Sequence, residues 1–148
     1  MTSSQDPSVH ASAVLIGERA VFIRGASGSG KSQLAFRLIL AGRAGILPRT
    51  VLIGDDRVRL HETDGHIIVQ SVPELAGMIA IRGLGIRHCD FEKQARLGLV
   101  VDLGAADAAR LPAPEALRTT LLGIELPRIP VAPGTDALPL VLAFLTTT

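Results

Sequence analysis

The segment GASGSGKS has the residue types and the spacing of a phosphate-binding loop. Its glycines would let main-chain N–H groups crowd around a polyphosphate, because no Cβ stands in the way. In such a loop the lysine reaches the β- and γ-phosphates, and the serine after it ligates magnesium. The alternative is a flexible turn that happens to be rich in glycine. The apolar stretch before the segment and the helical pattern after it favour a nucleotide site made of Gly25, Ala26, Ser27, Gly28, Ser29, Gly30, Lys31 and Ser32.

Two adjacent acids, Asp55 and Asp56, end the next apolar stretch, VLIG. In proteins with a phosphate-binding loop, an acid in this place holds the metal, directly or through water. Two acids can divide the work: one orients magnesium, and the other accepts a proton from an incoming hydroxyl group. The alternative is a solvated turn, where Asp-Asp pairs are common and inert.

His10 and Arg82 are further candidates outside these two segments. His10 lies just before the first apolar stretch, where a lone histidine is more often a surface or capping residue than a catalytic one. Arg82 belongs to the segment IRGLGI, in which glycines follow the positive charge. Such a loop suits a second phosphate contact, although a tight turn with an exposed arginine would have the same composition.

The elements that must position these residues alternate between strand and helix patterns. A helix is predicted after Gly30, with Gly42 at its C-terminal cap, and a second helix from Asp136, which is a candidate N-cap. The segment PAPEAL is expected to be a loop, and the proline-broken segment 124–133 is expected at a sheet edge. The other strands are predicted at 12–17, 19–25, 50–56, 57–62, 66–71 and 96–103, and the segment 78–86 is expected to be a strand that runs into a glycine-broken loop.

This order predicts an α/β domain with a mixed β-sheet flanked by helices. The length of 148 residues suits a single domain over residues 1–148, with residues 1–9 expected to be flexible. The first ten residues lack the basic and apolar parts of a signal peptide, and the apolar tail is too short to span a bilayer, so a cytoplasmic protein without membrane contact is expected.

The composition excludes several classes of function. The net charge is +1 without a basic run, and the chain has four Phe, no Trp and no Tyr, so nucleic acid is not an expected partner. The single cysteine excludes an intramolecular disulfide and a cysteine zinc cluster. The scarcity of aromatic residues also predicts loose recognition of a purine base.

The segments HASAVLI, GASGSGKS, IGDDRV, AIRGLGI and IPVAPGTD, in this order, resemble the catalytic domain of the HPr kinase/phosphorylase family. The resemblance runs from about His10 to Ala143. It implies the fold that this family shares with phosphoenolpyruvate carboxykinase. It further implies ATP and magnesium as cofactors, and a serine of HPr, a phosphocarrier protein of phosphotransferase systems, as acceptor. Since members of this family commonly assemble as hexamers, it also allows for a homo-oligomer.

The resemblance assigns roles by position. Asp55 would be the base toward the acceptor serine, and Asp56 would support the metal together with Ser32. His10 would lie near the transferred phosphate, and Arg82 would belong to a loop that meets the phosphate or the partner protein.

The chain departs from the family pattern at a few positions. Ala80 replaces a glutamate, Ala132 and Thr135 replace arginines, and the usual amino-terminal domain is not seen. This pattern resembles a short, single-domain form in which kinase activity is expected and the reverse phosphorolysis is not. Two other functions stay open: a non-catalytic module that senses nucleotides, and a small-molecule kinase built on the same loop.

Overall fold

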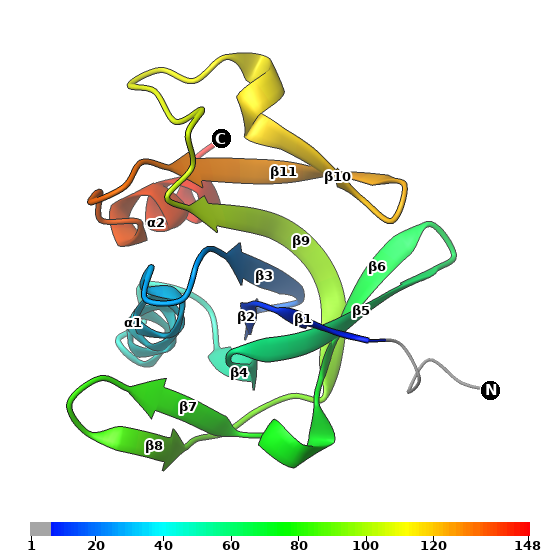
Figure 1. Cartoon of the computed structure of the whole chain (residues 1–148), viewed down its shortest axis with the longest axis vertical. Helices are drawn as coiled ribbons and strands as arrows, with labels where there is room; N and C mark the ends of the chain where they lie inside the picture. Colours follow the sequence, from blue (N-terminus) through cyan, green and yellow to red (C-terminus); the bar gives the residue numbers. More distant parts are fainter. Residues whose placement is uncertain (1–6) are drawn as a thin grey trace.

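The protein is described by a computed structural model that covers residues 7–148, with two α-helices and two short 3-10 helices around β-strands (Figure 1). In chain order the elements are β1 (Ser8–His10), β2 (Ser12–Ile16), β3 (Arg19–Arg24), α1 (Lys31–Arg43), β4 (Thr50–Gly54), β5 (Arg57–Thr63), β6 (His66–Ser71), η2 (Pro73–Leu75), β7 (Met78–Ile81), β8 (Gly85–His88), β9 (Gln94–Leu103), η3 (Pro114–Leu117), β10 (Arg118–Leu121), β11 (Ile124–Val131) and α2 (Leu138–Thr146).

The main sheet has nine strands and is mixed, as predicted. Its order is β1-β5-β6-β9-β3-β2-β4, with β11 beside β9 and β10 beside β11. Strand β9 runs parallel to both β3 and β11, and the other pairings are antiparallel. The parallel strands end at the same edge, where ligands bind in open α/β sheets. The glycine-rich turn, residues 25–32, begins at this edge.

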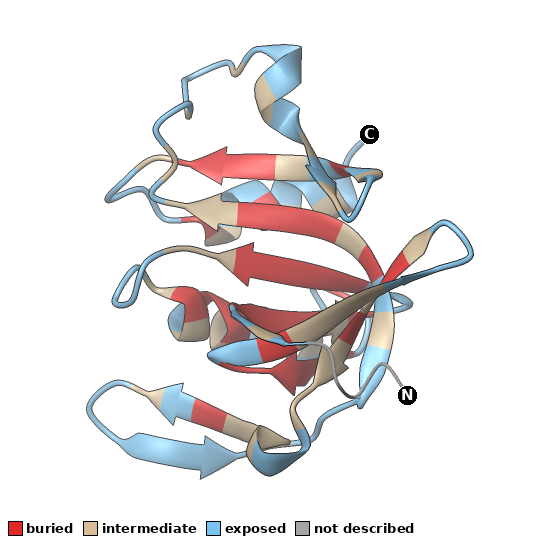
Figure 2. Ribbon diagram, turned by 45° about the vertical axis from the view of Figure 1, so that its right-hand side comes forward, coloured by how far each residue is buried: buried red, intermediate tan, exposed pale blue. Residues whose placement is uncertain are grey.

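Both faces of the sheet are covered, which explains why its strands have continuous apolar runs. Alternate residues of β3 point to opposite sides. Val21 and Ile23 join the core beneath α1 and α2, whereas Ala20 and Phe22 join a second core that includes residues of β5 and β6. Figure 2 shows the buried residues concentrated in the central strands. The strand with the glycine-rich turn at its end is therefore held from both sides.

A separate hairpin, β7–β8, extends from the body of the protein below α1 in the view of Figure 1. The sequence predicted a strand followed by a loop here, but residues 85–88 form a second strand. Leu84 and Ile86 are exposed, whereas Ile79 is buried in the core beneath α1. The hairpin is thus anchored by β7 and exposed along β8.

The structure differs from three other predictions made from the sequence. Gly42 lies inside α1 rather than at its cap, and Gly45, with φ +80°, follows the helix end at Ala44. Residues 8 and 9, expected to be flexible, pair with β5, while residues 1–6 lie outside the described part of the chain. The proline-broken segment, expected at a sheet edge, pairs with two strands, β10 over 124–127 and β9 over 128–131, so β11 is not a simple edge strand.

Helix α2 begins at Leu138 with Ala137 as its N-cap, one residue after the predicted cap Asp136, whose carboxylate accepts a hydrogen bond from the Leu138 main-chain N–H at 3.1 Å. Within residues 7–148, neither helix has the length and apolar character needed to cross a membrane.

Candidate functional site

The glycine-rich turn joins the end of β3 directly to the start of α1. Gly30 caps the helix in the left-handed conformation, with φ +102°, which a residue with a side chain rarely adopts. Gly25 is needed for a different reason, since a Cβ there would lie 2.5 Å from Ser29 Oγ and 3.1 Å from Leu103 Cβ. The turn therefore closes tightly on itself in front of a 13-residue helix whose N-terminus favours anions.

The side chain of Lys31 folds back to the first residues of this turn. Its side chain is buried at 6% exposure, and Nζ donates to the carbonyl oxygens of Gly25 at 2.8 Å and Ala26 at 3.1 Å. Because these carbonyls lie at the start of the turn, the ammonium group is held beside the main-chain loop rather than out in solvent. This is where a cation would meet a phosphate chain wrapped by residues 25–30.

Asp55 is a buried hub that joins three parts of the chain. Its carboxylate accepts hydrogen bonds from the hydroxyl of Ser12 at 2.7 Å and from that of Ser32 at 2.7 and 2.9 Å. The main-chain N–H of Ala80 donates to the same carboxylate at 3.0 Å. With 5% of its surface exposed, Asp55 fixes Ser32 and β7 in relation to β4.

Asp56 points the other way. Its backbone is left-handed, with φ +72°, and its side chain is 67% exposed. His10 Nε2 lies 2.9 Å from Asp56 Oδ1, and both residues face the pocket that the turn lines. The sequence expectation gave Asp55 the role of base and Asp56 that of metal ligand. The structure instead brings Asp55 to Ser32 and leaves Asp56 open to an incoming molecule.

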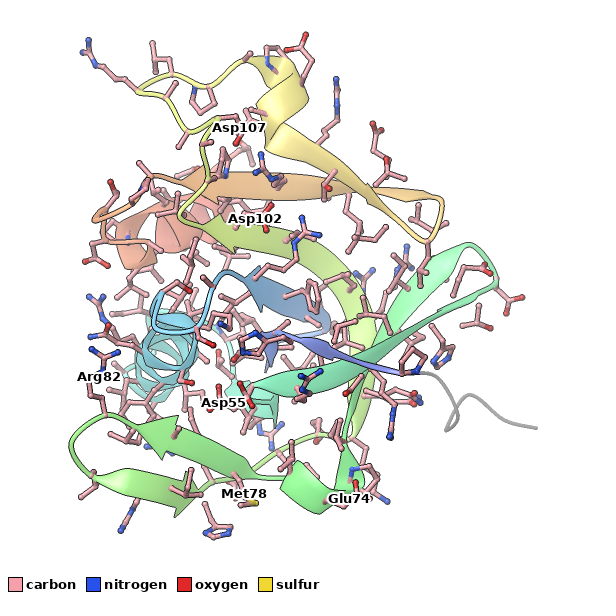
Figure 3. The ribbon with its side chains drawn as sticks, viewed as in Figure 1. Asp55, Glu74, Met78, Arg82, Asp102 and Asp107 are labelled. Carbon is pink, nitrogen blue, oxygen red and sulfur yellow. The ribbon has the colours of Figure 1, made fainter. Side chains whose placement is uncertain are left out.

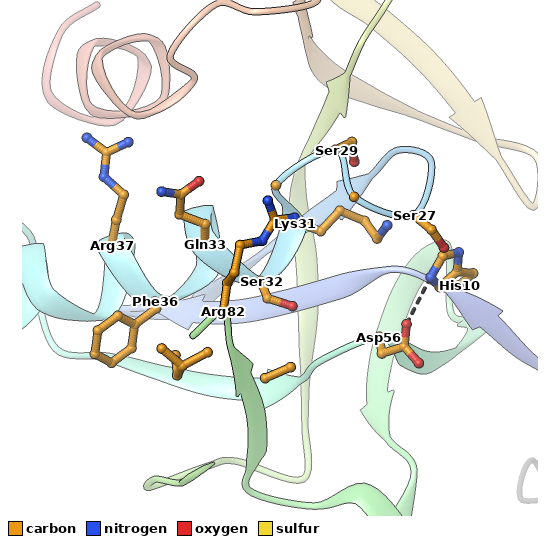
Figure 4. A pocket seen from close by; sticks show the side chains of 14 residues that line it. His10, Ser27, Ser29, Lys31, Ser32, Gln33, Phe36, Arg37, Asp56 and Arg82 are labelled. Carbon is orange, nitrogen blue, oxygen red and sulfur yellow. Dashed lines mark hydrogen bonds and ion pairs between the residues drawn. The ribbon is translucent and has the colours of Figure 1, made fainter. Parts of the chain in front are cut away.

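A pocket of about 760 Å³, within the range of small-molecule sites, is lined by most of these groups. Of the predicted site residues, Gly25, Ala26 and Asp55 do not line it. Arg82 comes from the β7–β8 turn, and Figure 4 shows its guanidinium group extended toward the start of α1. In Figure 3, Arg82 lies at the left beside the β7–β8 turn, and Asp55 lies nearer the centre, beside β4. The lining residues from the sequence prediction are His10, Ser27, Gly28, Ser29, Gly30, Lys31, Ser32, Asp56 and Arg82.

Sequence reasoning missed a chain of ion pairs behind the turn. Asp102, at the end of β9, accepts two hydrogen bonds from Arg24, at 2.7 and 2.9 Å, and one from Arg128, at 2.5 Å. Arg128 also donates to both oxygens of Asp107 and to the Ala116 carbonyl. The only sequence signal was an acid at the end of an apolar strand, the same signal that marked Asp55.

The two arginines of these ion pairs stabilise the ionised form of Asp102. Burial acts to raise the pKa of Asp102, but the hydrogen bonds from Arg24 and Arg128 outweigh it, so that the pKa lies below its ordinary value. Because Arg24 immediately precedes Gly25, the ion pairs fix the point at which the turn leaves the sheet.

A family model described as the HPr serine kinase C-terminal domain matches residues 2–146. The chain belongs to this family. The HPr kinase/phosphorylases of Azoarcus sp. (strain BH72) and Geobacillus thermodenitrificans (strain NG80-2) are each 36% identical to it, over 129 and 128 residues. These alignments cover 77% of the chain and 39% of each relative. The chain therefore spans well under half the length of these curated relatives.

The fold is also shared with a solved member of the family. The HPr(Ser) kinase/phosphatase from Coxiella burnetii superposes with a TM-score of 0.74 at 26% identity, covering 95% of this chain and 93% of that one. The predicted mixed α/β fold is confirmed by this match.

Two oxygen donors that could hold magnesium lie beside the glycine-rich turn: the Ser32 hydroxyl, which lines the pocket, and the buried Asp55 carboxylate, which does not. Magnesium keeps several waters and is bound through one or two carboxylates together with substrate phosphates. The Ser32 hydroxyl and the Asp55 carboxylate already lie within 2.7 Å of each other beside the turn. Among residues 7–148 no group of three or more His, Cys, Asp or Glu side chains gathers, so the donor set fits a metal shared with phosphates rather than one caged by protein.

Proposed function

We propose that this domain is an ATP- and magnesium-dependent protein-serine kinase whose acceptor is an HPr-type phosphocarrier protein of a phosphotransferase system. One observation carries the proposal: Lys31 and Ser32 of the glycine-rich turn line the same pocket as Asp56 and His10. Groups that bind phosphate and a group that can accept a proton thus face one space. The family relation supplies the class of acceptor.

The phosphates would be held by the main-chain N–H groups of residues 27–31 and by Lys31. Ser32 and Asp55 would hold magnesium, which supplies charge neutralisation to the phosphates when it is bound. This assignment reverses the sequence expectation, in which Asp55 was the base and Asp56 supported the metal. It is supported by the buried contact between Asp55 and Ser32, because a buried carboxylate with three donors cannot approach a protein substrate.

Asp56 would accept the proton of the acceptor serine. Phosphoryl transfer depends mainly on positioning and electrostatic stabilisation, so a carboxylate within hydrogen-bond reach is sufficient. His10, 2.9 Å from Asp56 Oδ1, would orient this carboxylate, and Arg82 would offset negative charge on the transferred group.

The test is phosphotransfer from labelled ATP to purified HPr-type proteins, with magnesium present and absent. Phosphoserine on the carrier in the presence of magnesium, lost when its serine is changed to alanine, supports the proposal. Tight nucleotide binding without transfer to any partner would instead identify a nucleotide sensor. Transfer to members of a panel of small alcohols and acids, and not to the carrier, would identify a small-molecule kinase. Adding inorganic phosphate to the phosphorylated carrier tests the reverse reaction, which we do not expect.

A further inference from the structure

The pocket extends well past the groups that the proposed transfer uses. His10 and Asp56 lie at one end, together with the glycine-rich turn. The opposite end is lined by residues of α1, with Phe36 and Arg37 at its limit, as Figure 4 shows, and Ile81 also lines the pocket. This second end has no role in binding phosphate or accepting a proton.

Helix geometry relates the two ends. Ser32 and Phe36 are four residues apart, so they lie on the same face of α1 with about 6 Å of helix rise between them. Gln33 and Arg37 are related in the same way one position further along. A nucleotide whose terminal phosphate faced Asp56 would reach these side chains if it continued along the pocket.

Phe36 gives the far end an apolar wall. The residue is half-buried, packs with Ile81 against the core beneath α1, and also lines the pocket. Of the other three phenylalanines, Phe22 is buried in the second core, while Phe91 and Phe144 do not line this pocket. An aromatic ring at the end of a phosphate site presents the kind of surface on which a base stacks.

Polar groups border this apolar wall. Arg37 is held at the rim by Asp136, with contacts of 2.7 and 3.2 Å, and so is fixed in relation to α2. Hydrogen bonding from Arg37 also lowers the pKa of Asp136, which keeps the pair charged. The amide of Gln33 can both donate and accept hydrogen bonds at the same wall. Apolar walls with a few placed polar groups are typical of small-molecule sites.

We propose that this end of the pocket binds the base of the nucleoside triphosphate, with Phe36 as the residue on which the base stacks. The inference rests on the proposed function and adds the direction in which the nucleotide lies. Because a stacked ring accepts any base, the proposal is compatible with the sequence expectation that a purine base is recognised loosely.

The test compares ATP with inorganic tripolyphosphate, which has the phosphates without the nucleoside, by calorimetry in the presence of magnesium. For Phe36→Ala we expect the ATP dissociation constant to rise about 5- to 150-fold, from the energy of base–aromatic stacking. The affinity for tripolyphosphate should change less than about twofold, since its contacts are unaltered. Phe144→Ala, which removes a 44% exposed ring on α2, is the matched control and should change neither affinity.

A fluorescence measurement gives an independent answer, because the natural chain has no Trp or Tyr. In Phe36→Trp the single indole should be quenched by ATP and not by tripolyphosphate, whereas the indole of Phe144→Trp should respond to neither. If Phe36→Ala does not fold, Phe36→Leu keeps most of the packing volume without the aromatic face and is measured in its place.

The outcomes separate this inference from the proposed function. Equal losses for ATP and tripolyphosphate, or no loss for ATP while the natural protein binds it, would overturn the base site and leave the kinase proposal standing. If the natural protein binds neither compound, the proposed function itself fails, and this inference fails with it.

Discussion

Replacing Asp102 with asparagine tests whether the ion pairs behind the glycine-rich turn hold it in place. The change keeps the shape of the side chain and one acceptor oxygen, but it removes the charge that Arg24 and Arg128 share. Arg128 retains Asp107 and the Ala116 carbonyl, so the larger effect is expected at Arg24, where the turn begins.

The expected loss follows from the contacts. Three N–H groups donate to Asp102 over 2.5–2.9 Å, and the side chain is 13% exposed. Hydrogen bonds to charged groups contribute about 1.5–3 kcal/mol each, and breaking a buried ion pair costs about 3–5 kcal/mol. Since asparagine still accepts one hydrogen bond, we expect Asp102→Asn to lower the free energy of unfolding by about 2–4 kcal/mol.

The assay is urea unfolding at pH 7, with Asp136→Asn as the matched control. Asp136 also binds an arginine, Arg37, through both oxygens, but this pair is exposed and should contribute little. The two variants thus differ in burial rather than in chemistry. Equal losses of stability in the two variants would refute the argument.

The pKa of Asp102 gives this prediction a pH dependence. Because the pKa is lowered in the folded state, its stabilisation is fully present above the ordinary aspartate value of about 3.9. It is lost as the pH falls through the lower folded value. The difference between the natural protein and Asp102→Asn should therefore be constant from pH 7 to about pH 5 and shrink near pH 3. A difference that grows on acidification would contradict the sign of this shift.

Three further substitutions test the site and its support. Lys31→Ala should weaken ATP binding at least about tenfold in calorimetry and abolish transfer, because a buried phosphate contact is lost. Asp56→Asn should bind ATP normally and slow single-turnover transfer by about 10²–10⁴-fold, the range for a general base. Gly42→Ala should destabilise the protein to urea by about 1–3 kcal/mol despite better helix propensity, since its Cβ would lie 2.7 Å from Thr50 Oγ1 and 3.0 Å from the Pro48 carbonyl oxygen.

Each of these expectations can fail in a distinct way. Unchanged ATP affinity in Lys31→Ala would remove the turn from the nucleotide site. Normal transfer by Asp56→Asn would return the role of base to Asp55. A more stable Gly42→Ala would mean that Thr50 moves aside freely and that α1 is not held close to β4.

Local patterns were sufficient to predict the strand, turn and helix around residues 25–32. The apolar run of β3 and the helical spacing after Gly30 lie next to each other in the chain, so no distant contact is needed to interpret them. The C-terminal end of α1 was harder to predict from the sequence. Gly42 and Gly45 are both plausible caps, and only the close approach of Thr50 explains why the first lies within the helix.

The different placement of the two acids, Asp55 buried against Ser32 and Asp56 exposed, could not be predicted from their types. It depends on the left-handed backbone at Asp56, which turns neighbouring side chains in different directions. The ion pairs of Asp102 were missed because they depend on the register between β3 and β9, which pairs Arg24 with a residue 78 positions away. Residue types indicate that such an acid exists, but they do not indicate its partners.

The long separation between β3 and β9 also affects how this protein matures on the ribosome. A nascent chain that has emerged through Glu92 contains Lys31, Ser32 and both acids of the DD pair, yet it lacks the strand that flanks β3 on its second side. Closing such distant pairs is entropically costly and slow. We therefore expect ATP to give a growing chain little protection from proteolysis until Leu103 has emerged from the ribosome.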